Sequence, residues 1–142
     1  MGGGMDNPEN QFIEIAPDSP TQHSIVPQER NGKPTVATIE YELLSSKPYA
    51  YTLAELKFAT HVKHKQIPAA ELKTQGLRLR EAFFAKPYAC MRASPLTKQY
   101  GWGAHYDEEG GIAIYPVEGK EYQRFVKDGN IRKFSAMRSK KA

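Results

Sequence analysis

One stretch of the sequence concentrates residue types that bind or react, and it runs from Ser94 to Asp107. It reads Ser-Pro-Leu-Thr-Lys-Gln-Tyr-Gly-Trp-Gly-Ala-His-Tyr-Asp and holds the only tryptophan, Trp102, between two glycines. The single cysteine, Cys90, and an arginine, Arg92, come just before it. These side chains could bind an anion, a metal or a nucleic-acid base, or act as base or nucleophile.

The start of this stretch has the form of an anion-binding site. Ser94 followed by proline is typical of a helix start, where free backbone N–H groups and the positive end of the helix dipole face outward. Arg92 and Lys98 would complete a cradle for a phosphate or a carboxylate. The competing interpretation is structural: Ser94 only caps the helix, and Arg92 pairs with a surface acid.

Two catalytic arrangements are also open. His105 and Asp107 share one face of a predicted strand, and a carboxylate can orient an imidazole as a general base. Cys90 lies in phase with Arg92, and a neighbouring cation favours the thiolate form of a cysteine. His61 or His105 would then serve as its base. Against this, a lone cysteine on a strand is more often a small buried side chain.

A metal site would need His61, His105 and Asp107 to converge from two neighbouring strands. The chain lacks the HExxH and CxxC spacings of common metal sites. Structural or solvent-exposed roles are the simpler interpretation of its histidines, so we predict neither a metal nor a cofactor.

Charge is distributed unevenly along the chain. The net charge is +4, and residues 120–142 hold eight basic and two acidic residues, so the first 119 residues carry −2. A basic C-terminal region near aromatic side chains is one way to bind nucleic acid, through phosphate contacts and base stacking. No nucleic-acid-binding motif occurs, and a solvated last helix explains the same charges.

Hydrophobic spacing and turn residues predict an α+β fold. Thr52 and Glu55 have the form of a capping box, which we interpret as a single helical turn. The order of elements favours an antiparallel sheet of about five to six strands packed with two or three helices. Strands are predicted at 11–15, 56–64, 88–93, 102–106, 112–115 and 131–137. Helices are predicted at 35–44, 68–86 and 118–127, with a short helix at 94–100, and residues 35–39 could equally form a strand.

Length and composition fit one domain, since 142 residues with 39% hydrophobic and 25% charged residues are typical of a globular protein. We predict a disordered N-terminus at 1–10, a single domain at 11–138 and a basic tail at 139–142. One cysteine excludes an intrachain disulfide and is compatible with a reducing compartment. The sequence shows no secretory signal and no membrane-spanning run, so we expect a cytoplasmic protein without membrane partners.

The chain resembles a family of small bacterial and fungal proteins of unknown function. The similarity covers about residues 11–142, and its most specific part is the 94–107 stretch. The resemblance implies a single fold unit and carries no activity over to this chain. The matching residues are Phe12–Glu14, Pro48–Thr52, Ser94–Lys98, Tyr100–Gly103, His105, Asp107, Gly110, Tyr122 and Met137–Lys140.

These observations lead to one expectation with two alternatives. We expect the 90–107 segment to bind a small anionic ligand or a protein partner, with a homodimer as one form of the latter. The alternatives are a small enzyme that uses His105 with Asp107, or Cys90, and a nucleic-acid-binding protein that uses the basic C-terminal region. The predicted binding residues are Arg92, Ser94, Lys98, Trp102, His105 and, as a neighbour, His61.

Overall fold

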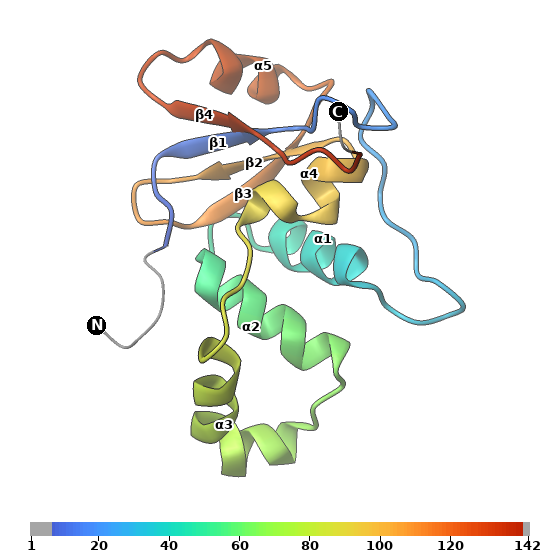
Figure 1. Cartoon of the computed structure of the whole chain (residues 1–142), viewed down its shortest axis with the longest axis vertical. Coiled ribbons are helices and arrows are strands. Elements are labelled where there is room, and N and C mark those ends of the chain that lie inside the picture. The colour runs from blue at the N-terminus through green and yellow to red at the C-terminus, as the bar shows by residue number, and fades with distance from the viewer. Residues whose placement is uncertain (1–6, 141–142) are drawn as a thin grey trace.

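Four strands form one mixed sheet in the computed structural model, which describes residues 7–140 (Figure 1). The order across the sheet is β3-β2-β1-β4, where β1 is Gln11–Glu14, β2 is Trp102–Tyr106, β3 is Ile112–Pro116 and β4 is Arg132–Ser135. The α-helices of residues 7–140 are α1 (Val36–Ser46), α2 (Leu53–His64), α3 (Ala69–Phe84), α4 (Pro95–Gln99) and α5 (Lys120–Lys127), and a 3-10 turn, η1, covers Met91–Ala93. The α+β class is therefore confirmed.

The sheet differs from the predicted one in size and in direction. β2 pairs antiparallel with β1 and β3, which confirms the predicted hairpin, but β1 and β4 run parallel. The expectation of five to six antiparallel strands is wrong. Helix α5 carries the chain from β3 across the sheet to its far edge, and such a crossover brings β4 in parallel to β3 and β1.

Residues 56–64 belong to α2, so the strand predicted there is wrong. The helix starts at a complete capping box, in which the Thr52 hydroxyl accepts from the Glu55 N–H and the Glu55 carboxylate accepts from the Thr52 N–H. Leu53, Leu56 and Thr60 are buried at spacings of three and four residues, the pattern of one helix face. The alternating pattern that predicted a strand starts at Leu56 and does not include Leu53. With Leu53 included, the buried residues follow helical spacing.

The strand predicted at 88–93 is also absent, because this segment is tied to the body by side chains instead of a sheet. Buried Met91 donates its N–H to the Tyr106 hydroxyl (3.0 Å), and its carbonyl accepts from the Thr97 hydroxyl (2.6 Å). These bonds satisfy both backbone groups of Met91 without a neighbouring strand. The segment therefore ends in η1 directly before α4.

The sheet is covered unequally on its two faces (Figure 1). The main core lies on the face toward α1 and α4, where Leu44, Leu96 and Tyr106 are fully buried. On the other face, Phe12 packs against Tyr122 and Phe125 of α5, with ring centroids 5.0 and 4.9 Å apart.

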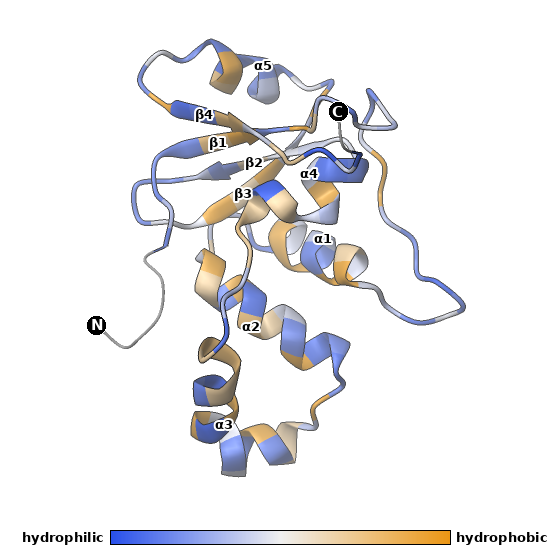
Figure 2. Cartoon of the chain, viewed as in Figure 1, coloured by the Kyte–Doolittle hydropathy of each residue, from blue (hydrophilic) through white to orange (hydrophobic). Residues whose placement is uncertain are grey.

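Helix α3 stands away from the sheet at the lower end of the molecule (Figure 1). None of its residues is buried, although apolar residues alternate with polar ones along it (Figure 2). Among residues 7–140, no helix is both long and apolar enough to cross a membrane.

Candidate functional site

The start of α4, where the sequence suggested an external anion site, faces the interior. Ser94 is only 1% exposed, caps the helix by accepting from the Leu96 N–H, and donates to Oε1 of Glu40 at 2.7 Å. The other carboxylate oxygen of Glu40 accepts from Lys57 Nζ at 2.9 Å. The anion at this helix start is thus a buried side chain of the protein itself.

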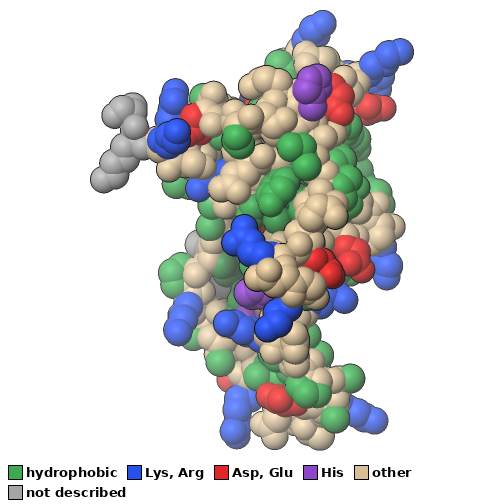
Figure 3. Space-filling model, turned by 90° about the vertical axis from the view of Figure 1, so that its right-hand side faces the viewer, with side chains coloured by type: hydrophobic (Ala, Val, Ile, Leu, Met, Phe, Trp, Pro, Cys, Tyr) green, Lys and Arg blue, Asp and Glu red, His purple; other side chains and the backbone are tan. Residues whose placement is uncertain are grey.

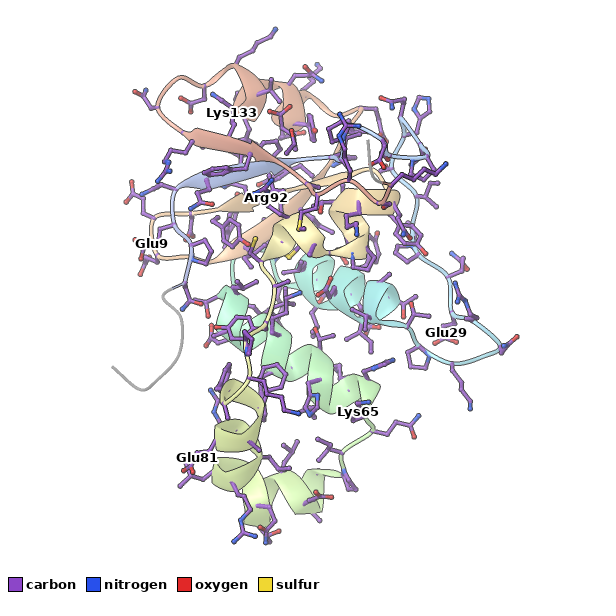
Figure 4. The ribbon with its side chains drawn as sticks, in the orientation of Figure 1. Glu9, Glu29, Lys65, Glu81, Arg92 and Lys133 are labelled. Carbon is purple, nitrogen blue, oxygen red and sulfur yellow. The ribbon has the colours of Figure 1, made fainter. Side chains whose placement is uncertain are left out.

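Arg92 is exposed and lies beside the sheet (labelled in Figure 4). Its Nε donates to the Ser135 carbonyl at 2.8 Å, and its carbonyl accepts from the Met137 N–H at 2.8 Å. Arg92 therefore holds the end of β4 and the chain that follows it. Lys98 is half-buried in the last turn of α4. With Arg92 exposed and Ser94 buried, the two do not line one open site.

The Gly-Trp-Gly motif anchors the long segment between β1 and α1. The Trp102 indole donates to the Ile25 carbonyl at 2.9 Å and packs on Tyr41. Gly101 has a φ of +78°, and a Cβ placed there would lie 2.4 Å from the His23 carbonyl oxygen. Both observations give the motif a structural role, since the close approach of the loop requires glycine.

His105 lies on the opposite face of the sheet from the main core, as its strand position predicts. A hydrogen bond of 2.8 Å joins its Nδ1 to the Tyr49 hydroxyl, and a second of 2.8 Å joins the hydroxyls of Tyr49 and Tyr115. The imidazole also stacks on Phe125 with centroids 4.2 Å apart. The partner of the imidazole is therefore a tyrosine and not Asp107, whose Oδ1 accepts from two backbone N–H groups of the hairpin turn.

The hydrogen-bonded residues Tyr49, His105 and Tyr115 form what we call the His105 cluster, and two of them have shifted pKa values. Burial lowers the pKa of His105, and this effect outweighs the negative charges of Asp107 and Asp128, which raise it. Burial, followed by the hydrogen bond to Tyr115, raises the pKa of Tyr49 above its ordinary value. Tyr49 also has a φ of +64°, which is costly for a bulky residue. Both pKa shifts favour the neutral forms of His105 and Tyr49.

His61 lies far from these groups, in what we call the arm: residues 61–88, comprising the end of α2, α3 and the segment after it. Its ring is 4.9 Å from the ring of Phe83. Phe83 and Phe84 pack against Phe58 of α2, with centroids 5.6 and 6.0 Å apart. These rings join the C-terminal end of α3 to the body.

The arm borders a half-open cavity of about 430 Å³ that the sequence analysis did not predict. Most of its wall is apolar, and this volume is within the range of small-ligand sites. A signal was present: Leu72, Gly76, Leu79 and Phe83 form a stripe at helical spacing, which sequence reasoning assigns to a core. The cavity is lined by His61, Leu79, Ala82, Phe83, Lys86, Pro87 and Tyr88.

The arm is also strongly basic. It holds six Lys or Arg residues and two Glu, so its net charge of +4 equals that of the whole chain. Across residues 7–140, the one pairing of Lys or Arg with a carboxylate within 4.0 Å is Lys57 with Glu40, outside the arm. Lys and Arg side chains are spread over this lower part of the molecule (Figure 3).

The predicted site residues thus fall into separate places. Ser94 is in the core, Arg92 is at β4, His105 is under α5, and His61 is on the arm. Cys90 is half-buried, and its Sγ accepts from a backbone N–H at 3.5 Å. Within residues 7–140, no three His, Cys, Asp or Glu side chains come together as a metal site requires.

Two of the predicted boundaries concern the chain ends. Residues 1–6 of the N-terminal segment and residues 141–142 of the basic tail lie outside the described residues. Of the rest, Asn7 accepts from the Ala54 N–H at 3.0 Å, and Asp18 accepts from the N–H groups of Ser139 and Lys140, both at 3.0 Å.

Comparison with known proteins identifies the chain by its family alone. No curated protein matches it, and no solved structure matches it. A family model matches residues 5–142, nearly the whole chain, and this agrees with the resemblance seen in the sequence. The chain belongs to the family of unknown function DUF6157.

Proposed function

We propose that this domain binds a partner protein and that the arm is its docking surface. One observation carries the proposal: α3 is 16 residues long and has an apolar stripe, yet none of its residues is buried. Most of the stability of a helix in a protein comes from packing of its apolar face. The aromatic contacts between α3 and α2 come from the phenylalanines near the end of α3.

The composition of the arm supports a protein as the ligand. Leu79 and Phe83 line an apolar cavity, and Lys86 stands on its wall. Protein interfaces combine apolar anchor pockets with a polar rim in this way. The proposal moves the binding surface from the 90–107 segment to the arm, because Ser94 and Trp102 are occupied by contacts within the chain.

A small anionic ligand in the same cavity is the second candidate. The cavity volume of about 430 Å³ and its wall of Phe83, Tyr88 and Lys86 suit an aromatic or aliphatic carboxylate. Such a ligand would raise the melting temperature of the full chain. The rise would be lost in Lys86→Ala, and a protein partner would compete with it.

The test compares Leu79→Glu with Leu77→Glu. Both place the same charge on α3, but Leu79 lines the cavity, whereas Leu77 is 75% exposed and points to the other side of the helix. Proteins captured on the immobilised chain are identified, purified and titrated against each variant, and circular dichroism checks that both variants fold. We expect Leu79→Glu to weaken the binding of one partner at least about tenfold, while Leu77→Glu leaves it nearly unchanged. If no captured protein distinguishes the two variants, the arm is not a docking surface.

A further inference from the structure

We propose that the occupant of the arm is an amphipathic helix with acidic residues beside its apolar stripe. The inference rests on the proposed function and adds the chemistry of the partner. Four observations on the arm carry it: the secondary structure around the cavity, the glycine in α3, the unpaired cations and the like charge of a second copy.

The secondary structure around the cavity favours a helical partner segment over an extended one. The walls of the cavity come from α2, α3 and the turn after α3, and no strand edge lies among them. An extended segment would find no ladder for its backbone N–H and C=O groups there, whereas a helix satisfies its own. The apolar stripe from Leu72 to Phe83 is about 16 Å long, which corresponds to three turns of a partner helix.

Gly76 lies within this stripe and is half-buried. A Cβ placed on it would meet no atom within 4 Å. Glycine inside a helix costs about 1 kcal/mol relative to alanine. A gap in the stripe, between Leu72 and Leu79, is where the backbone of another helix can approach most closely.

The charge of the arm selects an acidic partner. Arg78 lies a quarter-turn from Leu79 on α3, and Lys86 lines the cavity. Both side chains are exposed, and neither has a carboxylate within 4.0 Å among residues 7–140. A second copy of the arm would bring a net charge of +4 against +4. Charge complementarity therefore favours a different protein over self-association.

The first test uses labelled synthetic helices of about 18 residues, long enough to be helical when bound. One set carries leucines at three different helical spacings with glutamates beside them, and a matched set carries lysines in place of the glutamates. We expect the full chain to bind at least one glutamate peptide, more tightly at low salt, and to bind its lysine counterpart at least about tenfold more weakly. Equal binding of the two sets would overturn the acidic assignment.

Three variants of the chain then locate the peptide. Arg78→Glu/Lys86→Glu weakens the glutamate peptide at least about tenfold, while the matched reversal Arg124→Glu/Lys127→Glu on α5 leaves it nearly unchanged. We expect Gly76→Leu to weaken peptide binding without lowering the melting temperature, because a Cβ at this position meets no atom within 4 Å. The proposed mode is contradicted if Arg124→Glu/Lys127→Glu weakens the binding of the peptide, or if Gly76→Leu leaves its affinity unchanged.

The remaining outcomes separate this inference from the proposed function. If a captured partner distinguishes Leu79→Glu from Leu77→Glu but no peptide binds, the docking surface stands and the helical mode is wrong. If analytical ultracentrifugation shows a dimer that Leu79→Glu dissociates, the occupant is a second copy and the acidic partner is wrong. If Leu79→Glu weakens the binding of neither a captured partner nor a peptide, both proposals are wrong.

Discussion

The hydroxyl of Ser94 donates to Oε1 of Glu40 across 2.7 Å, although the two residues are 54 positions apart in the chain. Lys57 binds the other oxygen of the same carboxylate, so one buried acid joins α1, α2 and α4. A buried charge is tolerated only when its partners are in place. This relationship explains why the most distinctive motif of the sequence begins in the core instead of at a ligand.

Removal of this acid should be among the most destabilising single changes in the chain. Glu40 is 0% exposed, and Glu40→Ala leaves Lys57 and Ser94 without their acceptor. We expect a loss of about 3–5 kcal/mol in the free energy of unfolding, measured by urea denaturation. The double change Glu40→Leu/Lys57→Met should cost clearly less than the two single changes added together. Strict additivity would show that the ion pair is not coupled.

Two glycines should respond to alanine in opposite directions. At Gly103 a Cβ would lie 2.6 Å from ring atoms of Phe12 and Tyr122, so Gly103→Ala should destabilise the protein by about 1–3 kcal/mol. At Gly76 the Cβ meets nothing within 4 Å, so Gly76→Ala should stabilise α3 by up to about 1 kcal/mol. Thermal melting of the two variants side by side provides the measurement. A loss of stability in Gly76→Ala would mean that the glycine is already packed in solution.

His105 should make stability depend on pH in the mildly acidic range. Burial lowers its pKa in the folded state, so below the ordinary value of about 6.5 the unfolded chain binds more protons. The resulting stabilisation is fully present above this pH and is lost as the pH falls from this value through the lower pKa of the folded state. Urea midpoints compared between the natural chain and His105→Gln isolate this contribution from that of the carboxylates. An unchanged difference between the two proteins from pH 7.5 to pH 5.5 would contradict the burial of the imidazole.

The indole of Trp102 should protect the long segment before α1 from proteolysis. Its N–H donates to the Ile25 carbonyl at 2.9 Å, and the Ile25 N–H donates to the Tyr100 carbonyl at 2.8 Å. Trp102→Phe keeps an aromatic ring in place but removes the first of these bonds, so the segment should be cut faster under native conditions. Mass spectrometry of early fragments locates the cut. Cleavage that begins elsewhere, at an unchanged rate for this segment, would show that the indole bond does not hold the loop.

Local signals in the sequence predicted part of this structure. The hairpin, the short helix after Ser94, the long helix after Pro68 and the side of the sheet on which His105 lies all follow from neighbouring residues. The sequence failed at residues 56–64 and 88–93, where alternation and helical spacing compete within fewer than ten residues. Tertiary packing chose between them: Leu53, Leu56 and Thr60 are buried together on one helix face, and Met91 finds its partners in Tyr106 and Thr97.

The sequence by itself determined the fold class, the family and the candidate residues whose side chains can bind or react. Only the tertiary structure decided which of those residues remain available. Ser94 and Trp102 satisfy their hydrogen-bonding groups inside the chain, whereas the apolar stripe of α3 stays outside the core. The reason is that spacing along the chain reports which residues share a face, but whether that face is covered depends on elements distant in sequence.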